Sequence, residues 1–458
     1  MENQIKHKKA FDQSRRLVLK SGAVSVATSA MPLLSACSST DTEAGSNEGT
    51  SNPGALKIGL TIPLSGAYAD EGRDQQRGFE LAIKHLNGEG DAGMLSTMQP
   101  SSLQGNGVFG RPVEFVIADT ETRSSVAISV ATQLINEDKV SMLIGGSTSG
   151  TAIAIQGTAQ ELGAVYMTGM AHANEVTSSG GQANAFRQYM NSTISSSALA
   201  QTMVSELGAS RSAYYLTADY IWGDVTGAAI QQATEQLGWQ TVASVPTPVG
   251  AVNFTTYLDG FLDSGADVLV LVHYGNDMIN SVTQARSLGI PQMQVNGNAV
   301  AMAIPVFTTL MAEGAGGANI EGVYGTMNWH WSLQDDASVA FTSSYETEYG
   351  VKPSEAAHTV YVQTLQYADA VERAGSFLAC DVVHQLEGHS FDGTGNGACF
   401  YRTEDHQCFK DTLVVAGRAA PATASDLLEI RNTVARADVS YAVDSAFIFG
   451  GAGFCSNG

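Results

Sequence analysis

Three consecutive hydroxyl side chains, Ser147, Thr148 and Ser149, follow a short apolar run and precede a helical pattern. Hydroxyl groups beside the free N–H groups of a helix start make a binding site for a carboxylate or an amide oxygen. The plainer alternative is a helix N-cap that holds no ligand. The sequence therefore offers a candidate binding turn, and both interpretations stay open at this stage.

Motifs of catalysis and of metal binding are absent from the sequence. There is no G-x-S-x-G, H-E-x-x-H, Walker A or G-x-G-x-x-G motif. The Gly-rich stretch at 145–150 has no lysine for a phosphate loop. His384 and His389 are five residues apart, a spacing that does not place them on one helix face. We therefore expect no enzyme, no metal site and no cofactor.

Residues 1–36 have the pattern of a twin-arginine export signal. Arg15 and Arg16 are followed by a small apolar stretch that ends in Leu-Ser-Ala-Cys37, which resembles a lipobox. This pattern predicts lipidation at Cys37 and a lipid anchor on the periplasmic side of the cell envelope. The alternative is an ordinary signal peptide with an incidental cysteine. Residues 37–54 are rich in Ser, Thr, Glu and Gly, which is typical of a flexible tether.

Four cysteines remain after Cys37, and all lie in the last 80 residues: Cys380, Cys399, Cys408 and Cys455. Clustered cysteines in an exported chain favour two disulfides, with three possible pairings. We prefer Cys399–Cys408 as a local loop and Cys380–Cys455 as a link to the tail. A zinc site is the rival interpretation, and the lack of any C-x-x-C pair disfavours it.

Length and charge limit the classes of function further. A chain of 458 residues has room for two or three domains. It carries 45 acidic and 23 basic side chains, a net charge of −22. Such an acidic protein does not follow phosphate backbones, so we expect no nucleic-acid partner. For the same reason we expect membrane contact only through the N-terminal lipid.

Short apolar runs alternate with helical patterns from residue 55 onward. A first series of predicted strands covers 57–62, 113–118, 140–145 and 164–168, and a second covers 212–216, 241–245 and 267–272. Alternating strands and helices predict an α/β fold with two doubly wound, Rossmann-like lobes built on parallel sheets. The cleft at the carboxyl ends of the strands is then the expected ligand site.

The lobes are not expected to be continuous in sequence. We predict that residues 55–188 and 330–385 form the first lobe, and that residues 189–329 and 386–458 form the second. A chain that passes between lobes several times suits hinge closure around a ligand.

Several stretches resemble type I periplasmic solute-binding proteins of the leucine/isoleucine/valine class. They include LKIGLTIPLSGAYADEGRDQQRGFELAIKHLN, FVIADTETRSSVAISVATQLINEDKVSMLIGGSTSGTA, ADYIWGD, GADVLVLVHYGND and SFDGTGNGACFYRTEDHQ. The resemblance runs from about residue 56 to about residue 415. It implies two α/β lobes joined by three crossovers, one solute held between them, and docking onto the permease subunits of an ABC importer. It also implies that the protein does no chemistry on the solute.

The resemblance assigns ligand contacts to several turns. The turn at 147–149 holds the ligand carboxylate in this family, and Ser149 matches the key serine. Met170 and His172 lie where the family uses backbone groups and a hydroxyl, although His172 could instead be a surface residue. Trp222 and Tyr274 match two aromatic contacts, with core packing as the alternative for the tryptophan.

Three positions bear on the identity of the solute. Glu71, with Tyr68 three residues earlier, stands where an aromatic residue follows the first strand in the family. Asn298 stands where an acidic residue binds the ligand ammonium. Glu71 or Asp277 could supply that carboxylate; otherwise the resemblance implies a neutral or anionic solute. The aromatic cluster 328–331 either lines the cleft or packs the hinge.

These observations lead to one expectation about function and one alternative. We expect a monomeric substrate-binding lipoprotein of an ABC importer, which captures a branched-chain amino acid, an amide, urea or a related organic acid. The alternative is a lipid-anchored sensor of the same fold that acts with a signalling partner.

Overall fold

The computed structural model describes residues 54–66, 68–421, 423 and 425–450. The chain divides into two units, 1–51 and 52–458, and the second is the one described below. The predicted export signal, the tether up to residue 53, Cys37 and Cys455 lie outside the described residues. Within the described part, every helix is too short or too polar to cross a bilayer.

The first sheet has five parallel strands in the order β2-β1-β3-β4-β5. Its strands are β1 (Lys57–Ile62), β2 (Glu114–Asp119), β3 (Met142–Gly145), β4 (Val165–Thr168) and β5 (Ala185–Arg187). The central strands β1, β3 and β4 are almost fully buried because helices cover both faces of the sheet.

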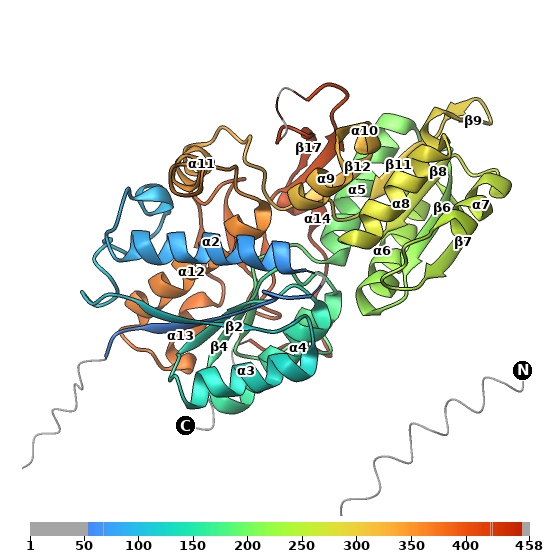
Figure 1. The fold of residues 1–458 in the computed structure, drawn as a ribbon. Helices are drawn as coiled ribbons and strands as arrows, with labels where there is room; N and C mark the ends of the chain where they lie inside the picture. The colour runs from blue at the N-terminus through green and yellow to red at the C-terminus, as the bar shows by residue number, and fades with distance from the viewer. Residues whose placement is uncertain (1–53, 67, 422, 424, 451–458) are drawn as a thin grey trace, which may run out of the picture. The chain divides into compact units, whose positions relative to one another are not determined.

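Alternate residues along the strands of the first sheet pack in two separate hydrophobic cores, one on each face. Met142 and Ile144 pack in the core beneath α2 and α12, whereas Leu143 packs in the core beneath α3 and α4. Figure 1 shows these helix pairs on opposite sides of the sheet. The helices of this lobe are α2 (Ala69–Leu86), α3 (Ser124–Asn136), α4 (Ser149–Leu162), α11 (Asp336–Tyr349), α12 (Glu355–Ala374) and α13 (Ala379–Leu386).

The second sheet has seven strands in the order β17-β16-β12-β11-β8-β6-β7. The five strands from β12 to β7 are parallel, and β16 and β17 add to the edge in antiparallel pairs. Its strands are β6 (Ser212–Ala218), β7 (Gln240–Thr247), β8 (Val268–Val272), β11 (Ala301–Ile304), β12 (Tyr324–Met327), β16 (Thr412–Gly417) and β17 (Leu428–Val434).

Helices and one small hairpin complete the second lobe. The helices are α5 (Ser192–Leu207), α6 (Ile221–Gln236), α7 (Thr255–Ser264), α8 (Asn276–Ser287), α9 (Thr309–Ala315), α10 (Gly317–Ile320) and α14 (Arg436–Val439). The hairpin pairs β9 (Gln294–Val295) with β10 (Asn298–Ala299) before β11 begins. The expected pair of α/β lobes is therefore confirmed.

The chain crosses between the two sheets three times. It leaves the first sheet after β5, returns after β12 to form α11, and crosses again from β15 to β16. Before the last crossing, β13 (Ser390–Phe391), β14 (Cys399–Tyr401) and β15 (Cys408–Phe409) form a small antiparallel sheet. The resemblance predicted three crossovers, and the structure has them.

The small sheet packs against the cores of both lobes, because Phe409 on β15 belongs to the core of the second lobe. Phe391, Cys399, Tyr401 and Cys408 belong to the same hydrophobic core as α2 and α12. The prediction grouped 386–458 with the second lobe, and the packing of these four residues differs from that grouping. β16 and β17 do join the second sheet, so the segment after residue 386 serves both lobes.

Side chains tie the three crossovers to one another. Asn328, on the second crossover, donates its amide to Gln188 Oε1 on the first at 3.4 Å. Asn396, which precedes the third, donates to the carbonyl oxygens of Asn328 at 3.1 Å and Asp411 at 2.7 Å. The three segments are thus joined at one place in the fold.

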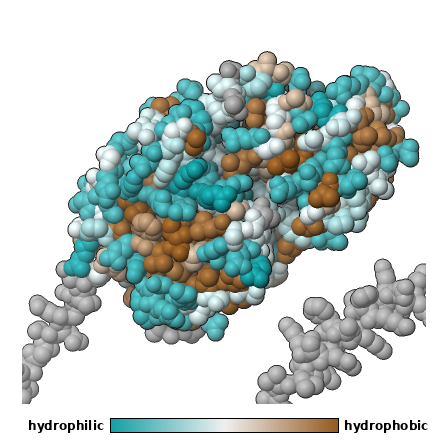
Figure 2. Space-filling model, in the orientation of Figure 1, coloured by the Kyte–Doolittle hydropathy of each residue, from teal (hydrophilic) through white to brown (hydrophobic). Residues whose placement is uncertain are grey.

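The outer edge of the first sheet is partly open. β2 is the edge strand, and Phe115 on it is 40% exposed. Figure 2 shows hydrophobic residues gathered on the face between α2 and α3, where β2 lies. The cleft-facing ends of the central strands are, by contrast, buried.

Candidate functional site

The turn after β3 contains both of the features that the sequence left open. Thr148 is the N-cap of α4, and its hydroxyl accepts from Thr151 N at 3.2 Å. Ser149 Oγ accepts from Ala173 N at 3.1 Å, and Ser147 Oγ accepts from Gln75 Nε2 at 3.0 Å. All three hydroxyls therefore bond within the protein, and Ser147 connects the turn to α2.

Glu71 lies buried in the first turn of α2, whose N-cap is Tyr68. Gly72 allows this placement, because a Cβ there would lie 1.7 Å from the carbonyl oxygen of Pro63. Gln75 Nε2 donates to Glu71 Oε1 at 3.3 Å, and the Tyr274 hydroxyl donates to Oε2. Burial raises the pKa of the Glu71 carboxyl to about 7, although hydrogen bonds from Ser147 and Tyr274 oppose the shift.

The Tyr274–Glu71 bond joins the two lobes. Tyr274 follows β8 of the second sheet, and Glu71 belongs to α2 of the first lobe. The rings of Tyr68 and Tyr274 also meet edge to face, with centroids 5.7 Å apart. The lobes are therefore in contact at the carboxyl ends of both sheets, as a closed cleft requires.

An aromatic cluster surrounds His172, which follows β4. Its ring lies 4.7 Å from Tyr189, 5.6 Å from Tyr274 and 6.2 Å from Trp222, measured between centroids. Burial lowers the pKa of His172 to about 3, so the ring is neutral at physiological pH. The surface alternative for His172 is wrong, because only 4% of the residue is exposed.

Several buried polar atoms in this region have no hydrogen-bond partner within the described protein. They are His172 Nε2, Tyr189 Oη, Trp222 Nε1 and Gln75 Oε1. Buried polar groups are normally paired, so such a set indicates a polar solute that supplies the missing partners. Trp222 offers a donor and Gln75 an acceptor, while His172 and Tyr189 can take either role.

Met170 and Asn298 end up in different surroundings. Met170 is fully buried beside His172, and its N–H donates to the Gly146 carbonyl at 2.7 Å. Asn298 instead lies in the β9–β10 hairpin and donates to Asp267 Oδ2 at 2.7 Å. Asp267 precedes β8, so Asn298 is at the amino end of the sheet, opposite the cleft. Asn298 therefore does not belong to the candidate site.

Four residues of the cleft were not predicted from the sequence: Gln75, Tyr189, Thr309 and Glu355. Gln75 could have been found, because it lies one helical turn after Glu71. Glu355 begins α12, and its Oε2 accepts from Thr309 Oγ1 at 3.0 Å. Burial raises the pKa of Glu355 to about 8. No local pattern marks Glu355, because its partner lies 46 residues earlier.

A small cavity of about 80 Å³ opens beside Glu71, between α2 and the first turns of α8 and α9. Asp277 lies near it on α8, where its carboxylate accepts from Gly250 N at 3.0 Å through each oxygen. Asp277 therefore caps a loop of the second lobe, and it is not among the residues that line the cavity.

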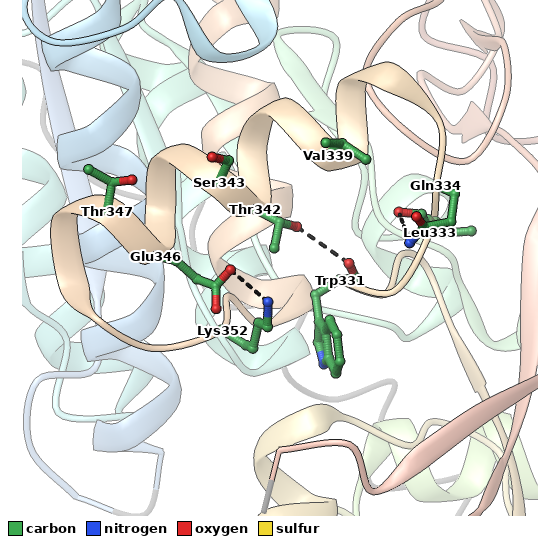
Figure 3. Close-up of a pocket in the computed structure, with 9 residues that line it drawn as sticks. All are labelled: Trp331, Leu333, Gln334, Val339, Thr342, Ser343, Glu346, Thr347 and Lys352. Carbon is green, nitrogen blue, oxygen red and sulfur yellow. Dashed lines mark hydrogen bonds and ion pairs between the residues drawn. The ribbon is translucent and has the colours of Figure 1, made fainter. Parts of the chain in front are cut away.

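The residues 328–331 pack mainly into the fold. The Trp329 ring stacks on His358 at 4.4 Å in the core of the first lobe, and its Nε1 donates to Ser338 Oγ at 2.9 Å. Figure 3 shows Trp331 at a separate surface pocket beside α11, where Lys352 pairs with Glu346. Lys352 Nζ also lies 4.8 Å above the Trp331 ring. This pocket contains none of the predicted ligand contacts.

The predicted disulfide Cys399–Cys408 is wrong, since both residues are buried free thiols. Tyr401 pairs with Cys408, so Cys399 lies diagonally across from Cys408, and the two thiols are joined by a side-chain hydrogen bond and not by a disulfide. The other predicted partner, Cys455, lies outside the described residues, and its pairing with Cys380 stays a prediction. No group of three or more metal-ligating side chains occurs in the part of the chain that the structure describes.

The comparisons with known proteins agree with this architecture. The periplasmic binding protein family model matches residues 55–420. The Leu/Ile/Val-binding protein homolog 7 of Brucella abortus (strain 2308) is 24% identical over 344 residues, which cover 72% of this chain and 80% of that protein.

Two solved structures share the fold. The amino acid ABC transporter substrate-binding protein of Pseudomonas fluorescens Pf-5 has a TM-score of 0.76 and 21% identity, covering 86% of this chain and 98% of its own. The branched-chain amino acid transporter substrate-binding protein of Streptococcus pneumoniae, in complex with isoleucine, has a TM-score of 0.68 and 20% identity, with coverage of 83% and 99%. The chain belongs to the periplasmic binding protein family.

Proposed function

We propose that this protein captures a small polar solute between its two lobes, closes around it by hinge bending, and delivers it to the permease of an ABC importer. One observation carries the proposal: unpartnered buried polar atoms from both lobes lie in one aromatic cluster. His172 Nε2 comes from the first lobe and Trp222 Nε1 from the second. A solute that pairs with both atoms favours the closed form.

The solute belongs to the class of branched-chain amino acids, amides, urea and related organic acids. The turn at Ser147–Ser149 and the rings of Trp222 and Tyr274 are its proposed contacts. The isoleucine complex of the Streptococcus pneumoniae neighbour supports this class by likeness of fold. The neutral His172 ring suits a hydrogen bond better than an ion pair with the solute.

The protein is anchored to the membrane by a lipid on Cys37, after export by the twin-arginine route. The basic start, the twin arginines and the Leu-Ser-Ala-Cys37 sequence support this part of the proposal. A monomer is sufficient, because both walls of the cleft come from one chain.

Thermal shift measurements with a panel of amino acids, amides, urea and carboxylates test solute capture, since binding to the native state raises the melting temperature. A solute that binds should also reduce the radius of gyration in small-angle scattering. Tight binding without any compaction would contradict hinge closure. Binding without uptake of the labelled solute by cells that make the matching permease would favour the sensor alternative.

Replacing Trp222 by alanine tests the aromatic contact directly. We expect Trp222→Ala to weaken solute binding by about 1–3 kcal/mol, because a buried indole and its N–H are lost. Trp331→Ala, in the separate surface pocket, is the matched control and should leave binding unchanged. Equal affinities of the Trp222→Ala protein and the unmodified protein, measured by calorimetry, would remove Trp222 from the site.

A further inference from the structure

The cavity beside Glu71 has an unusual lining for a site that receives a polar solute. About half of its wall is aromatic or aliphatic, and it also carries two carboxyl groups. The lining residues are Tyr68, Asp70, Glu71, Tyr274, Gly275, Asn276, Ile279, Thr308, Leu310 and Met311. Its volume of about 80 Å³ exceeds the roughly 10–15 Å³ that one water needs, so it can hold a small chemical group.

The charged side chains that line this cavity are both acidic. No lysine or arginine lines it, while Asp70 and Glu71 both do. The charged side chain that acts most on Glu71 is Asp74, another acid, and Asp74 also acts on the buried Glu355. Arg73 already pairs with Asp70, which leaves Glu71 as the lining acid without a basic partner, so an anionic group beside Glu71 would meet repulsion and lose its water. A cationic group would instead give Glu71 the counter-ion that it lacks.

The hydrogen bonds that Glu71 already accepts limit which kind of cation can bind beside it. A carboxylate accepts about four hydrogen bonds. Gln75, Tyr274 and Ser147 already donate to Glu71, so about one position is left. A primary ammonium brings three N–H donors, which need acceptors such as Asp70, Asn276 and Thr308, whereas the walls formed by Ile279, Leu310 and Met311 suit alkyl groups. An ammonium whose hydrogens are replaced by alkyl groups needs no such partners.

The two tyrosine rings favour the same kind of group. Tyr68 and Tyr274 form adjoining walls, with ring centroids 5.7 Å apart and planes 68° apart. Aromatic faces attract cations, and quaternary ammonium groups are bound in this way by aromatic cages. The Tyr274 hydroxyl donates to Glu71, which places the ring and the carboxylate at one end of the cavity.

We propose that this cavity receives an N-alkylated ammonium group of the transported solute, with Glu71 as its counter-ion and the rings of Tyr68 and Tyr274 against its alkyl groups. The inference rests on the proposed function, because it concerns the solute held between the lobes. Within the solutes named above it favours amino-acid-like zwitterions with an alkylated nitrogen, and it extends the class to organic cations of the same kind.

Because Glu71 ionises, the proposed binding should depend on pH. Burial raises the pKa of this carboxyl to about 7, and a cation binds its ionised form. Affinity should therefore fall as the pH drops through 7. The titratable groups that face Glu71 are Asp74 on α2, Tyr68, Tyr189, Tyr220 and Tyr274 around the cleft, and Glu355 and Asp277 nearby. The tyrosines stay protonated in this range, because burial raises their pKa values.

Choline and 3,3-dimethylbutan-1-ol form a matched pair of probes, since they have the same shape and differ in charge. Calorimetric titration of the full-length protein at pH 8 should show choline binding at least tenfold more tightly than the alcohol. Between pH 8 and pH 6 the affinity for choline should fall about tenfold, following the ionised fraction of Glu71. The affinity for the alcohol should stay constant over the same range.

Substitutions test the Glu71 carboxylate and the Tyr274 ring one at a time. Glu71→Gln should weaken choline binding at least tenfold at pH 8 and remove its pH dependence. Tyr274→Leu should weaken it more than Tyr274→Phe, which keeps the aromatic face. Glu161→Gln, on the exposed side of α4, is the control and should behave like the unmodified protein. Thermal melts of each variant confirm that it is folded before it is compared.

Three results would overturn the inference. The first is equal or tighter binding of the neutral alcohol, and the second is unchanged choline binding by Glu71→Gln. The third is binding and compaction with leucine, an amide or a carboxylate while choline is silent, which leaves the proposed function intact. Silence of choline and of the whole solute panel would count against both proposals.

Discussion

Two buried carboxyl groups dominate the cleft at the scale of single residues. Glu71 and Glu355 lie in different helices, and burial raises the pKa values of both, to about 7 and about 8. Each is held by hydrogen-bond donors and neither by a basic side chain. Glu355 therefore stays largely protonated near neutral pH and Glu71 is about half ionised at pH 7, and ionising either buried group costs stability as the pH rises.

The free energy of unfolding should depend on pH in a way that shows this cost for Glu355. In the unfolded chain the carboxyl ionises near pH 4.5, whereas in the folded protein it keeps its proton up to about pH 8. The folded state binds more protons across this window, so the free energy of unfolding falls as the pH rises. Relative to the unmodified protein, Glu355→Gln should gain roughly 3 kcal/mol between pH 5 and pH 8 in urea unfolding. Glu161→Gln is the control, and a parallel pH dependence for Glu355→Gln would contradict the expectation.

The sequence predicted those site residues that come directly after a predicted strand. Ser147, His172, Trp222 and Tyr274 each follow a predicted strand, and the structure brings them together. Asn298 was misplaced because a short hairpin precedes β11, and one extra turn moves a residue to the other end of a sheet. Glu355 could not be predicted, since its role depends on the docking of α12 against α9.

Among the elements, the three crossovers are held together by side-chain hydrogen bonds. The Asn396 side chain joins two of them through the carbonyl oxygens of Asn328 and Asp411. Its backbone has φ of 62°, a left-handed value that asparagine and glycine tolerate. Asn396 thus adopts the left-handed backbone of its turn and also links the two crossovers through its side chain.

Asn396→Gly keeps this backbone and removes the amide. We expect the free energy of unfolding to fall by about 1–3 kcal/mol, because two buried hydrogen bonds are lost. Asn296→Gly is the matched control, since Asn296 has φ of 53° but is exposed. Urea unfolding of both variants measures the difference, and equal losses would show that the amide of Asn396 adds nothing.

The positions of the strands were easier to predict than the contacts between neighbouring strands. The predicted strands at 57–62, 212–216 and 267–272 overlap β1, β6 and β8, because apolar runs between helical patterns mark buried parallel strands. The sequence placed Cys399 and Cys408 together correctly, but the structure joins their thiols by a hydrogen bond and not by a disulfide.

For the whole molecule, the Tyr274–Glu71 bond holds the two lobes together. Tyr274→Phe removes the hydroxyl and keeps the ring contact with Tyr68, so the closed form should lose part of its stability. Without added solute, small-angle scattering should show a larger radius of gyration for this variant. Tyr214→Phe, in the core of the second lobe, is the control. Identical scattering curves for the Tyr274→Phe and unmodified proteins would show that the bond does not hold the cleft closed.

The link through Gln188, Asn328 and Asn396 also limits how the lobes can move. Three connections joined at one place confine bending between the lobes to one region of the fold. Closure of the proposed kind then occurs at that one region. Any contact made across the cleft bends the same region, whichever solute makes it. A partner that recognises the closed shape would meet one geometry for every solute, so recognition of the solute and recognition of the closed protein can vary independently.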